Sequence, residues 1–493
     1  MSQFKIVQGG MGVGVSGWPL ARAVSRAGQL GVVSGTGLGI VMLRRLQCGD
    51  SGGHMRRALA HFPFPQVAQR VLEQYYIPGG KPADQPFKLS PMPQMEPSAA
   101  FIELVVVANF AEVYLAKEGH GGSVGINYLE KLQLPTLPSL YGAMLAGVDY
   151  VLMGAGIPRF IPGSLDALAE GRTATLPIDI DGVEPMSERT LHRFDPEKFC
   201  GARALPTKRP QFLAIISSSI LAMTLARKSN GRVDGFIVEG ASAGGHNAPP
   251  RGAMQFNARG EPIYGPRDLP DLEKIRELGL PYWMAGGFAD PQKVRDAIAS
   301  GAAGVQIGTA FAFCDESGID PKIKKQTIRR IQSGDIDVFT DPLASPTGFP
   351  FKVMQVPGTL ADKDVYAARA RICDLGYLRK AYLREDGQIG HRCAAEPVED
   401  YLRKGGKQSE TVGRKCICNA LFGTIGLAQI QQDHRLEPAI VTAGDDLSCV
   451  ARLLKPGTTR YTAADAIEYL LGGNQSQRAQ STQRLETSVR KDE

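Results

Sequence analysis

Short apolar runs rich in β-branched residues alternate with segments of helical periodicity through the central part of the chain. Such alternation is typical of βαβ units and of a parallel sheet. Eight strands are predicted, which is the number that a TIM (β/α)8 barrel needs. They are Lys5–Val7, Leu30–Ser34, Ser123–Asn127, Tyr150–Met153, Leu213–Ile216, Gly235–Glu239, Tyr282–Ala285 and Gly304–Ile307.

Helices are predicted between several of these strands, each after a residue that can cap its first turn. They are Pro19–Ala27 after Ser16, Leu140–Ala146 after Ser139, and Pro291–Ser300 after Asp290. The third has proline at its first position and glycine just beyond its end, which is the usual asymmetry of helix ends. A serine cap is also expected within the apolar stretch Phe212–Ala226, which reads as a strand followed by a helix.

Parts of the chain exceed a minimal barrel. We assign residues 1–320 to the barrel and interpret residues 40–110 within it as an insertion, or lid, over the barrel mouth. Residues 321–473 are predicted to form a mainly helical C-terminal extension. The last segment, 474–493, is polar and is predicted to be disordered.

Composition narrows the class of protein. The net charge of +6 is mild for 493 residues, and no dense basic block is interleaved with aromatic residues, so nucleic acid is not an expected partner. The N-terminus lacks the apolar core of a signal peptide, and no membrane span is predicted, so we expect a cytoplasmic protein with reduced cysteines.

Glycine-rich turns follow three of the predicted strands. Gln8-Gly9-Gly10-Met11-Gly12 follows the first, and its glycines would let backbone amides approach a ring or an anion. Gly286 and Gly287 follow the seventh strand, and Gln306-Ile307-Gly308-Thr309 continues from the eighth. Loops after strands 7 and 8 form the usual phosphate site of such barrels, so we predict one there, supported by the helix that starts at Pro291.

The segment after the sixth strand is the most informative for chemistry. It reads Glu239-Gly-Ala-Ser-Ala-Gly-Gly-His246-Asn247. Histidine transfers protons near neutral pH, and the glycines beside it leave room for a substrate and a cofactor. We therefore predict that His246 is catalytic. Asn127 ends the third strand and is a candidate to hydrogen-bond the edge of a cofactor, although it could equally cap the loop.

Together these loops resemble the nitronate monooxygenase family, formerly called 2-nitropropane dioxygenases, whose superfamily includes the flavin-dependent enoyl-acyl-carrier-protein reductases. The segments that carry the resemblance are IVQGGMG, VGINYL, VEGASAGGHNAP, MAGGFAD and VQIGTAF. The resemblance implies non-covalently bound FMN and a catalytic role for His246. The flavin contacts that it implies are Gly10, Met11, Asn127, Glu239, Gly244, Gly286, Gly287, Gln306, Gly308 and Thr309.

The sequence departs from the family pattern at three positions. The monooxygenases usually have glutamine at Glu239 and an acid at Ser242, and proline is common at Gly10. Glutamate at the first of these positions resembles the reductases. The expected function is oxidation of alkyl nitronates by O2 to carbonyl compounds and nitrite. The alternatives are an NAD(P)H-dependent enoyl-thioester reductase and a non-catalytic flavin-binding scaffold. By analogy with such enzymes, a homodimer is possible.

Some cysteines and histidines are not explained by this function. Cys373, Cys393, Cys416 and Cys418, with His391, could bind zinc or an iron–sulfur cluster, but without a C-x-x-C pair buried thiols are the favoured interpretation. No barrel strand ends in the lysine that a Schiff-base aldolase needs. His54 and His120 stand beside glycines and are interpreted as surface or capping residues, and Cys48 and Cys314 as structural ones.

Overall fold

A computed structural model describes residues 4–432 and 434–472. Its centre is a barrel of eight parallel strands in the order β1-β11-β10-β9-β8-β4-β3-β2. Hydrogen bonds between Leu30 and the backbone of β1 close the barrel on itself. The strands are β1 (Ile6–Gln8), β2 (Gly31–Ser34), β3 (Val124–Leu129), β4 (Tyr150–Gly154), β8 (Gln211–Ile216), β9 (Gly235–Glu239), β10 (Tyr282–Ala285) and β11 (Gly304–Ile307). The predicted TIM barrel is therefore confirmed, with all eight strands in place.

The barrel interior is filled by apolar side chains that come from different strands. Each strand alternates its side chains, so every second residue points inward and the inward residues meet as a packed core. Phe4 closes the amino-terminal end, stacked on Trp283 with 5.3 Å between ring centroids. The interior members are Val7, Leu30, Val32, Leu152, Leu213, Ile237, Trp283 and Ala285. This core closes the barrel from below and leaves its carboxyl end for a site.

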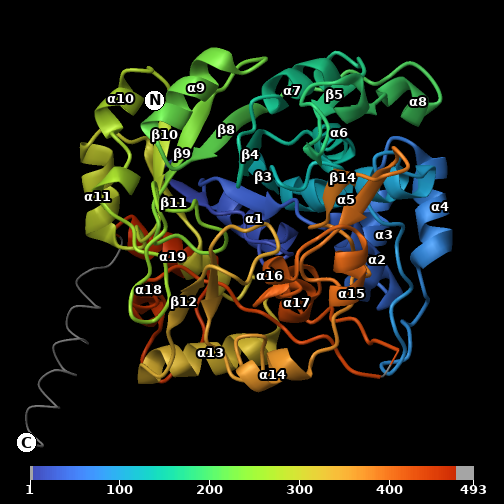
Figure 1. The fold of residues 1–493 in the computed structure, drawn as a ribbon. Coiled ribbons are helices and arrows are strands. Elements are labelled where there is room, and N and C mark those ends of the chain that lie inside the picture. The colour runs from blue at the N-terminus through green and yellow to red at the C-terminus, as the bar shows by residue number, and fades with distance from the viewer. Residues whose placement is uncertain (1–3, 433, 473–493) are drawn as a thin grey trace, which may run out of the picture.

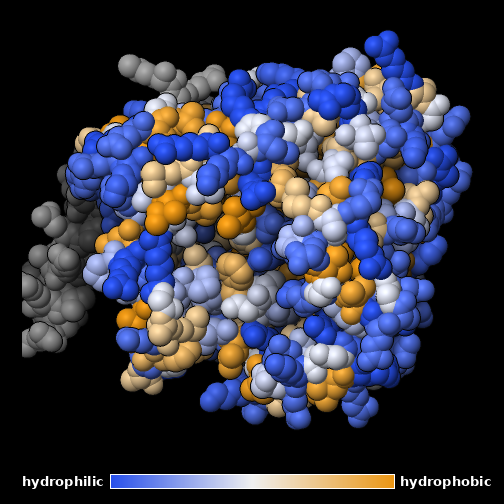
Figure 2. Space-filling view, turned by 45° about the horizontal axis from the view of Figure 1, so that its top comes forward, coloured by the Kyte–Doolittle hydropathy of each residue, from blue (hydrophilic) through white to orange (hydrophobic). Residues whose placement is uncertain are grey.

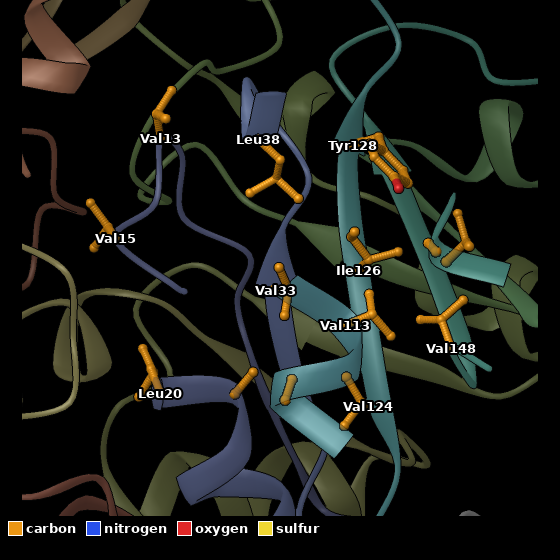
Figure 3. Packing of buried hydrophobic residues seen from close by; sticks show 14 of the residues in the cluster. Val13, Val15, Leu20, Val33, Leu38, Val113, Val124, Ile126, Tyr128 and Val148 are labelled. Atoms are coloured by element: carbon orange, nitrogen blue, oxygen red, sulfur yellow. The ribbon is translucent and has the colours of Figure 1, made fainter. Parts of the chain in front are cut away.

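A second core lies between the strands and the surrounding helices. Figure 3 shows Val33, Val124 and Ile126 of neighbouring strands directed toward Leu20 and Val113 of the helix layer. The helices of this layer are α1 (Trp18–Arg26), α5 (Ala99–Lys117), α6 (Thr136–Leu145), α7 (Ile161–Ala169), α9 (Ser219–Lys228), α10 (Leu272–Arg276), α11 (Pro291–Ala299) and α12 (Thr309–Ala312).

The predicted helix caps are only partly right. Asp290 caps α11 through bonds from the amides of Gln292 and Lys293, and Ser218 caps α9. The caps at Ser16 and Ser139 are wrong. Ser16 instead accepts a hydrogen bond from the Met11 amide at 2.7 Å. Ser139 lies inside α6, which begins three residues earlier because Pro138 fits the first turn of a helix.

Residues 40–110 lie beside the barrel and do not cover its mouth. They hold α2 (Leu38–Gln47), the 3-10 turn η1 (Ser51–Gly53), α3 (His54–Leu59), α4 (Pro65–Tyr75) and the first part of α5. Helix α5 packs against α6, α1 and α2, so it serves as the barrel helix between β2 and β3. The structure describes all of residues 40–110, and none of them lines the cavity at the carboxyl ends of the barrel strands. The cover expected from this segment comes instead from the C-terminal part of the chain.

Among the described residues, α5 is the one helix that is long and apolar enough to resemble a membrane span. By length and composition it would pass as a membrane span, but 72% of that window is buried inside the protein, as in a core helix.

Figure 2 shows a face on which hydrophilic side chains surround separate hydrophobic patches.

A further excursion from the barrel, which the sequence analysis missed, leaves the ring between β4 and β8. After α7 it forms β5 (Ala174–Pro177), β6 (Ile180–Asp181), η2 (Glu188–Thr190), β7 (Leu191–Phe194) and α8 (Pro196–Cys200). Strands β5 and β7 pair antiparallel. A long loop after β9 holds the 3-10 turn η3 (Pro266–Asp268).

The C-terminal part gathers mostly on one side of the barrel strands, in yellow to red (Figure 1). Its helices are α13 (Pro321–Ser333), α14 (Lys363–Ala368), α15 (Val398–Arg403), α16 (Gln408–Thr411), α17 (Ile417–Thr424), α18 (Ser448–Leu453) and α19 (Ala463–Leu470). Its strands are β12 (Val338–Asp341), β13 (Phe351–Met354), β14 (Lys380–Leu383) and β15 (Ile389–Arg392). Helices outweigh strands in this part, although most of its residues lie in loops, and β14 also pairs with β6 of the excursion. The segment predicted to be disordered, 474–493, lies outside the described residues.

Candidate active site

One cavity opens at the carboxyl ends of the barrel strands, where TIM barrels carry their sites. The residues predicted as site residues all line it, although they come from five different strands and the loops that follow them. They are Gly10, Met11, Asn127, Glu239, Gly244, His246, Gly286, Gly287, Gln306, Gly308 and Thr309. The barrel thus brings the whole predicted set together.

His246 is held by residues that the sequence analysis did not single out. Its Nε2 lies 2.7 Å from the Oγ of Ser345, which in turn lies 2.8 Å from the Oγ1 of Thr347. The ring also meets Phe351 edge to face, with centroids 4.8 Å apart. Burial lowers the pKa of His246 to about 4, so the imidazole is neutral at physiological pH. A fixed, neutral imidazole can accept a proton.

Backbone pairing fixes the loop that carries His246. The amide of Asn247 donates to the carbonyl of Pro350, and the amide of Lys352 donates to the carbonyl of Gly245, both at 2.9 Å. These bonds form a short antiparallel bridge between the loop after β9 and the start of β13. The histidine is therefore positioned by a C-terminal strand as well as by the barrel.

Glu239 ends β9 and faces the cavity. Burial raises its pKa to about 7. No hydrogen bond to its carboxylate is formed by the residues that the structure describes. A carboxyl group with this pKa exists partly protonated at neutral pH, so it can act as donor or acceptor toward a ligand.

Gly10 is required by its neighbour Asn127. A Cβ atom added at Gly10 would lie 2.2 Å from the Cβ of Asn127. Asn127 uses its amide nitrogen to donate to the carbonyls of Tyr128 and Leu152, at 2.9 and 3.3 Å. The proline common at this position in the resembling family would meet the same obstacle, which explains this departure.

The expected phosphate loops lie side by side at the ends of β10 and β11. Gly287 and Gly308 line the cavity, and the Oε1 atom of Gln306 is buried without a hydrogen-bond partner in the described structure. The expectation that the start of α11 binds an anion needs correction, because the Asp290 carboxylate already accepts from two of its free amides. The glycine loops and Thr309 are therefore the remaining candidates for binding an anion.

The C-terminal segment supplies the remaining wall of the cavity. Residues from α17, from the stretch before α18 and from α18 itself line it, and they are Leu421, Thr424, Ile440, Val441, Thr442, Ala443, Gly444, Asp446 and Cys449. A Cβ atom on Gly244 would lie 2.8 Å from the backbone of Ala443, so this approach requires glycine. In the sequence, only the short segment Thr442-Ala443-Gly444 distinguishes this wall, and no pattern in it indicates that it packs against the loop after β9.

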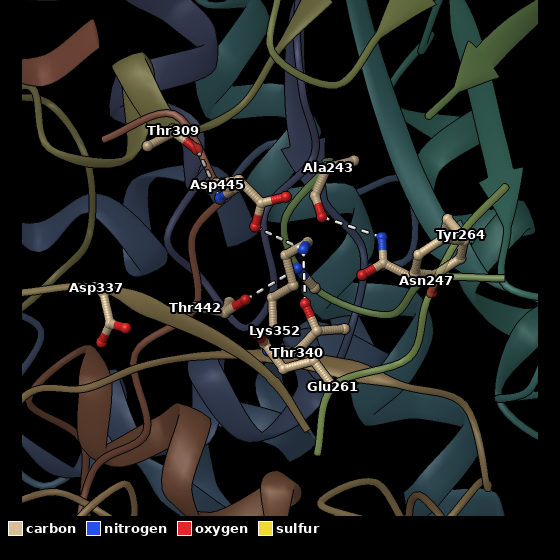
Figure 4. A network of polar contacts seen from close by, with 12 residues as sticks. Ala243, Asn247, Glu261, Tyr264, Thr309, Asp337, Thr340, Lys352, Thr442 and Asp445 are labelled. Atoms are coloured by element: carbon tan, nitrogen blue, oxygen red, sulfur yellow. Dashed lines mark hydrogen bonds and ion pairs between the residues drawn. The ribbon is translucent and has the colours of Figure 1, made fainter. Parts of the chain in front are cut away.

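A polar network fastens this wall to the barrel, as Figure 4 shows. The Nζ of Lys352 lies 2.6 Å from a carboxylate oxygen of Asp445 and donates to Thr340 at 2.8 Å. The hydroxyl of Thr309 accepts from the amide of Gly444, and Thr442 accepts from the amide of Gly245, both at 2.9 Å. The wall is therefore bonded to the loops that follow β9 and β11.

The cavity fits a flavin mononucleotide in three respects. The amide oxygen of Gln306 is orphaned and can accept from a ring N–H group. Glycines stand where side chains would block a planar ring or a phosphate. Asp446, an acid that lines the cavity, lies 3.1 Å from Arg452, which offsets its charge. We conclude that the residues present are compatible with this cofactor.

The other histidines considered in the sequence lie away from this cavity. His54 packs against Trp18 with ring centroids 4.9 Å apart, and His120 contacts the carbonyl of Ala116 near the end of α5. Of the cysteines interpreted as structural, Cys314 is buried and Cys48 is exposed.

Fold and site together define a class: a TIM barrel whose single-histidine cavity is built from glycine-rich loops at the strand ends. Within this class, residues 207–343 match the nitronate monooxygenase family, and the resemblance seen in the motifs is confirmed.

Two curated relatives illustrate the match. A "Probable nitronate monooxygenase" of Bacillus subtilis is 36% identical over 108 residues, which is 22% of this chain and 29% of the relative. A "(3aS,4S,5R,7aS)-5-hydroxy-7a-methyl-1-oxo-octahydro-1H-indene-4-carboxyl-CoA dehydrogenase" of Mycobacterium tuberculosis is 31% identical over 161 residues, 32% of this chain and 39% of the relative. The chain thus spans less than half of either relative.

Solved structures also align with the chain. FabK from Thermotoga maritima aligns over 99% of this chain and 96% of its own, with a TM-score of 0.45 and 16% identity. A nitroalkane oxidase from Streptomyces ansochromogenes aligns over 71% and 76%, with a TM-score of 0.34 and 21% identity.

Proposed function

We propose that this chain is an FMN-dependent oxidoreductase that oxidises alkyl nitronates with O2 to carbonyl compounds and nitrite. The observation that carries the proposal is the neutral His246, fixed by Ser345 at the edge of a glycine-walled cavity. The family match of residues 207–343 supports the same reaction class.

The cavity residues divide into those that would hold the ring and those that would hold the phosphate. Gly10, Met11 and Asn127 would face the isoalloxazine, with Glu239 and Gln306 as its hydrogen-bond partners. Gly286, Gly287, Gly308 and Thr309 would hold the phosphate, and Gly244 keeps the approach open. When bound, FMN accepts two electrons from the substrate and passes them to O2.

His246 would act on the substrate through proton chemistry. Because its imidazole is neutral, it can take the acidic proton from a nitroalkane, or donate a hydrogen bond to a nitronate that already carries the charge. The Ser345 hydroxyl is hydrogen-bonded to Nε2, so the ring would keep one orientation and Nδ1 would remain for the substrate. The wall of residues 440–446 would limit entry of water to this point.

A second candidate is an NAD(P)H-dependent reductase of enoyl thioesters. The observation that favours it is Glu239, which stands where the monooxygenases usually have glutamine and whose pKa of about 7 suits proton exchange. The relative from Mycobacterium tuberculosis is named as acting on a carboxyl-CoA, which is also a thioester.

Product analysis separates the two reactions. We expect the purified protein to convert propyl-nitronate in air into propanal and nitrite, with matching oxygen uptake. In parallel, NADH or NADPH with crotonyl-CoA should give no enoyl reduction. Reduction of the enoyl thioester without nitrite formation would replace the first candidate by the second. Neither reaction, with flavin bound, would favour the scaffold.

A further inference from the structure

Four cysteines of the C-terminal part converge on one small cavity outside the flavin site. Cys373 follows α14, Cys393 directly follows β15, and Cys416 and Cys418 stand at the start of α17. All four line the same cavity, together with apolar neighbours such as Leu375. Residues from three separate segments therefore meet where a group of thiols surrounds a void.

The four thiols are sheltered and protonated in the absence of a ligand. Cys393 is buried and the other three are half-buried. Burial raises the pKa of all four, to about 11 for Cys373. Such thiols are poor nucleophiles, because the thiolate is the reactive form. A role in redox or acyl chemistry of their own is therefore not what this arrangement favours.

Neither a disulfide nor a single metal ion accounts for the group. All four cysteines are free, and the described histidines, cysteines and acids include no three that converge on one ion. Four thiolates that do not converge on one ion can still share a cluster of several metal ions, each bound by its own thiolate.

We propose that Cys373, Cys393, Cys416 and Cys418 bind an iron–sulfur cluster. Four cysteine thiolates are the usual ligand set of such clusters, and they stand apart at its corners because iron and sulfide fill the space between them. On assembly, each S–H bond is replaced by an S–Fe bond and four protons are released, with sulfide and iron, in the ferrous and ferric states that the finished cluster contains, as the co-reactants, so no further oxidant or reductant is needed.

Two arginines near the cavity offset the negative charge that thiolates and cluster carry. Arg379 acts on Cys373 and Arg369 acts on Cys416, and in both cases the positive charge lowers the pKa of the thiol. Arg369 is itself held by Glu437 at 2.7 Å, so its position is fixed. Asp374 and Glu437 act on Cys416 in the opposite direction, so the arginines offset the charge of these acids as well as that of the thiolates.

Helix α17 connects this site with the flavin cavity. Cys418 lies near its start, and Leu421, which lines the flavin cavity, follows three residues later. At about 1.5 Å per residue the two positions are about 4.5 Å apart along the helix axis. The cluster would thus be a one-electron centre placed directly beside the proposed two-electron site, although its binding does not depend on which substrate that site takes.

Iron and sulfide content of the full-length protein tests the proposal. Purified under anaerobic conditions and reconstituted with ferrous and ferric iron and sulfide, it should hold about two to four iron atoms and an equal amount of acid-labile sulfide. Dithionite should then produce an electron paramagnetic resonance signal that persists after the flavin is removed. Stoichiometric zinc without sulfide, or no retained iron after reconstitution, would overturn the proposal.

Cysteine variants assign the ligands. Cys418→Ser and Cys393→Ser should each lose most of the iron and the signal. Cys314→Ser removes a buried thiol away from the cavity and should keep both, and Cys48→Ser does the same at the surface. Wild-type iron content in Cys418→Ser would contradict the assignment. If these variants fail to fold, as judged by circular dichroism, the iron and sulfide content of the wild type still decides.

Discussion

The chemistry proposed here depends on one side chain whose protonation is set by its surroundings. His246 meets a hydroxyl and an aromatic ring, and no acid in the described structure forms an ion pair with it. Burial therefore lowers the pKa of His246 without an ion pair to oppose it, and this keeps the imidazole neutral. The residue is suited to accept a proton but not to carry a lasting positive charge.

Replacing His246 tests that role. His246→Ala should retain the flavin and lose about 10²-fold or more in kcat, the usual scale for a general acid–base group. His61→Ala, at an exposed histidine, should leave kcat unchanged. The comparison is made by oxygen uptake with propyl-nitronate. An unchanged rate in His246→Ala would place the chemistry elsewhere.

The pH dependence of stability reports on Glu239. Its pKa is about 7 in the folded chain against 4.5 as an ordinary value, so the folded state holds a proton that the unfolded state releases. The flavin-free protein should therefore lose stability as the pH rises from 4.5 to 7. Glu239→Gln cannot ionise and should remove this part of the dependence. Urea unfolding across this range measures it, and identical profiles for both proteins would contradict the assigned pKa.

At the scale of elements, the site depends on a seam between the loop after β9 and the stretch before α18. The backbones approach so closely that only glycine fits at position 244, and hydrogen bonds from the amides of Gly245 and Asp445 cross the seam. The C-terminal wall is thus part of the cavity and not an accessory.

Gly244→Ala tests this seam. The added methyl group would press on backbone atoms of Ala443 at 2.8 Å, so the wall must move. We expect flavin affinity to fall at least about tenfold, equivalent to 1.4 kcal/mol. Gly240→Ala is the matched control in the same loop, because its Cβ would meet only ordinary contacts from 3.6 Å. Fluorescence titration with FMN measures both, and equal affinities would show that the wall does not shape the site.

At the scale of the whole molecule, Arg44 ties the β2–β3 connection to the C-terminal part. It is 1% exposed, donates to the carbonyl of Leu427 at 2.6 Å, and lies over the rings of Phe87 and Phe422. Burial lowers its pKa to about 10, which still leaves it charged at neutral pH. Three segments far apart in the sequence therefore depend on one guanidinium group.

Arg44→Ala should reduce the free energy of unfolding by about 2–4 kcal/mol, from the lost ring contacts, the unpaired carbonyl and the space left behind. Arg44→Met retains much of the volume and should lose less. Chemical denaturation followed by circular dichroism gives both values. A loss below about 0.5 kcal/mol in Arg44→Ala would mean that the C-terminal part is held by other contacts.

The barrel was predictable from the sequence because each of its strands and turns is determined by residues that are neighbours in the chain. Each strand is a short apolar run, and the glycine turns after β1, β9, β10 and β11 stand next to the strands that position them. The C-terminal wall was not predictable for the opposite reason. His246 meets Ser345 across 99 positions, and Gly245 meets Thr442 across 197, and no periodic pattern connects such partners.

The caps at Ser16 and Ser139 failed for a related reason. A serine can bond many neighbours, and Ser16 satisfies the Met11 amide within its own loop rather than a helix end. The convergence of the four cysteines was also not predictable from the sequence. Without a C-x-x-C pair the sequence favoured isolated buried thiols, and only the fold brings Cys373 and Cys393 to Cys418.

The most direct test of the proposed function is anaerobic stopped-flow absorbance of the FMN-loaded protein, mixed separately with propyl-nitronate and with NADH or NADPH. The proposed function predicts that nitronate bleaches the flavin, that the nicotinamides do not, and that His246→Ala slows bleaching by about 10²-fold. Bleaching by NADH or NADPH alone would contradict nitronate oxidation and favour the reductase. A protein that neither carries nor takes up FMN would contradict the cofactor itself.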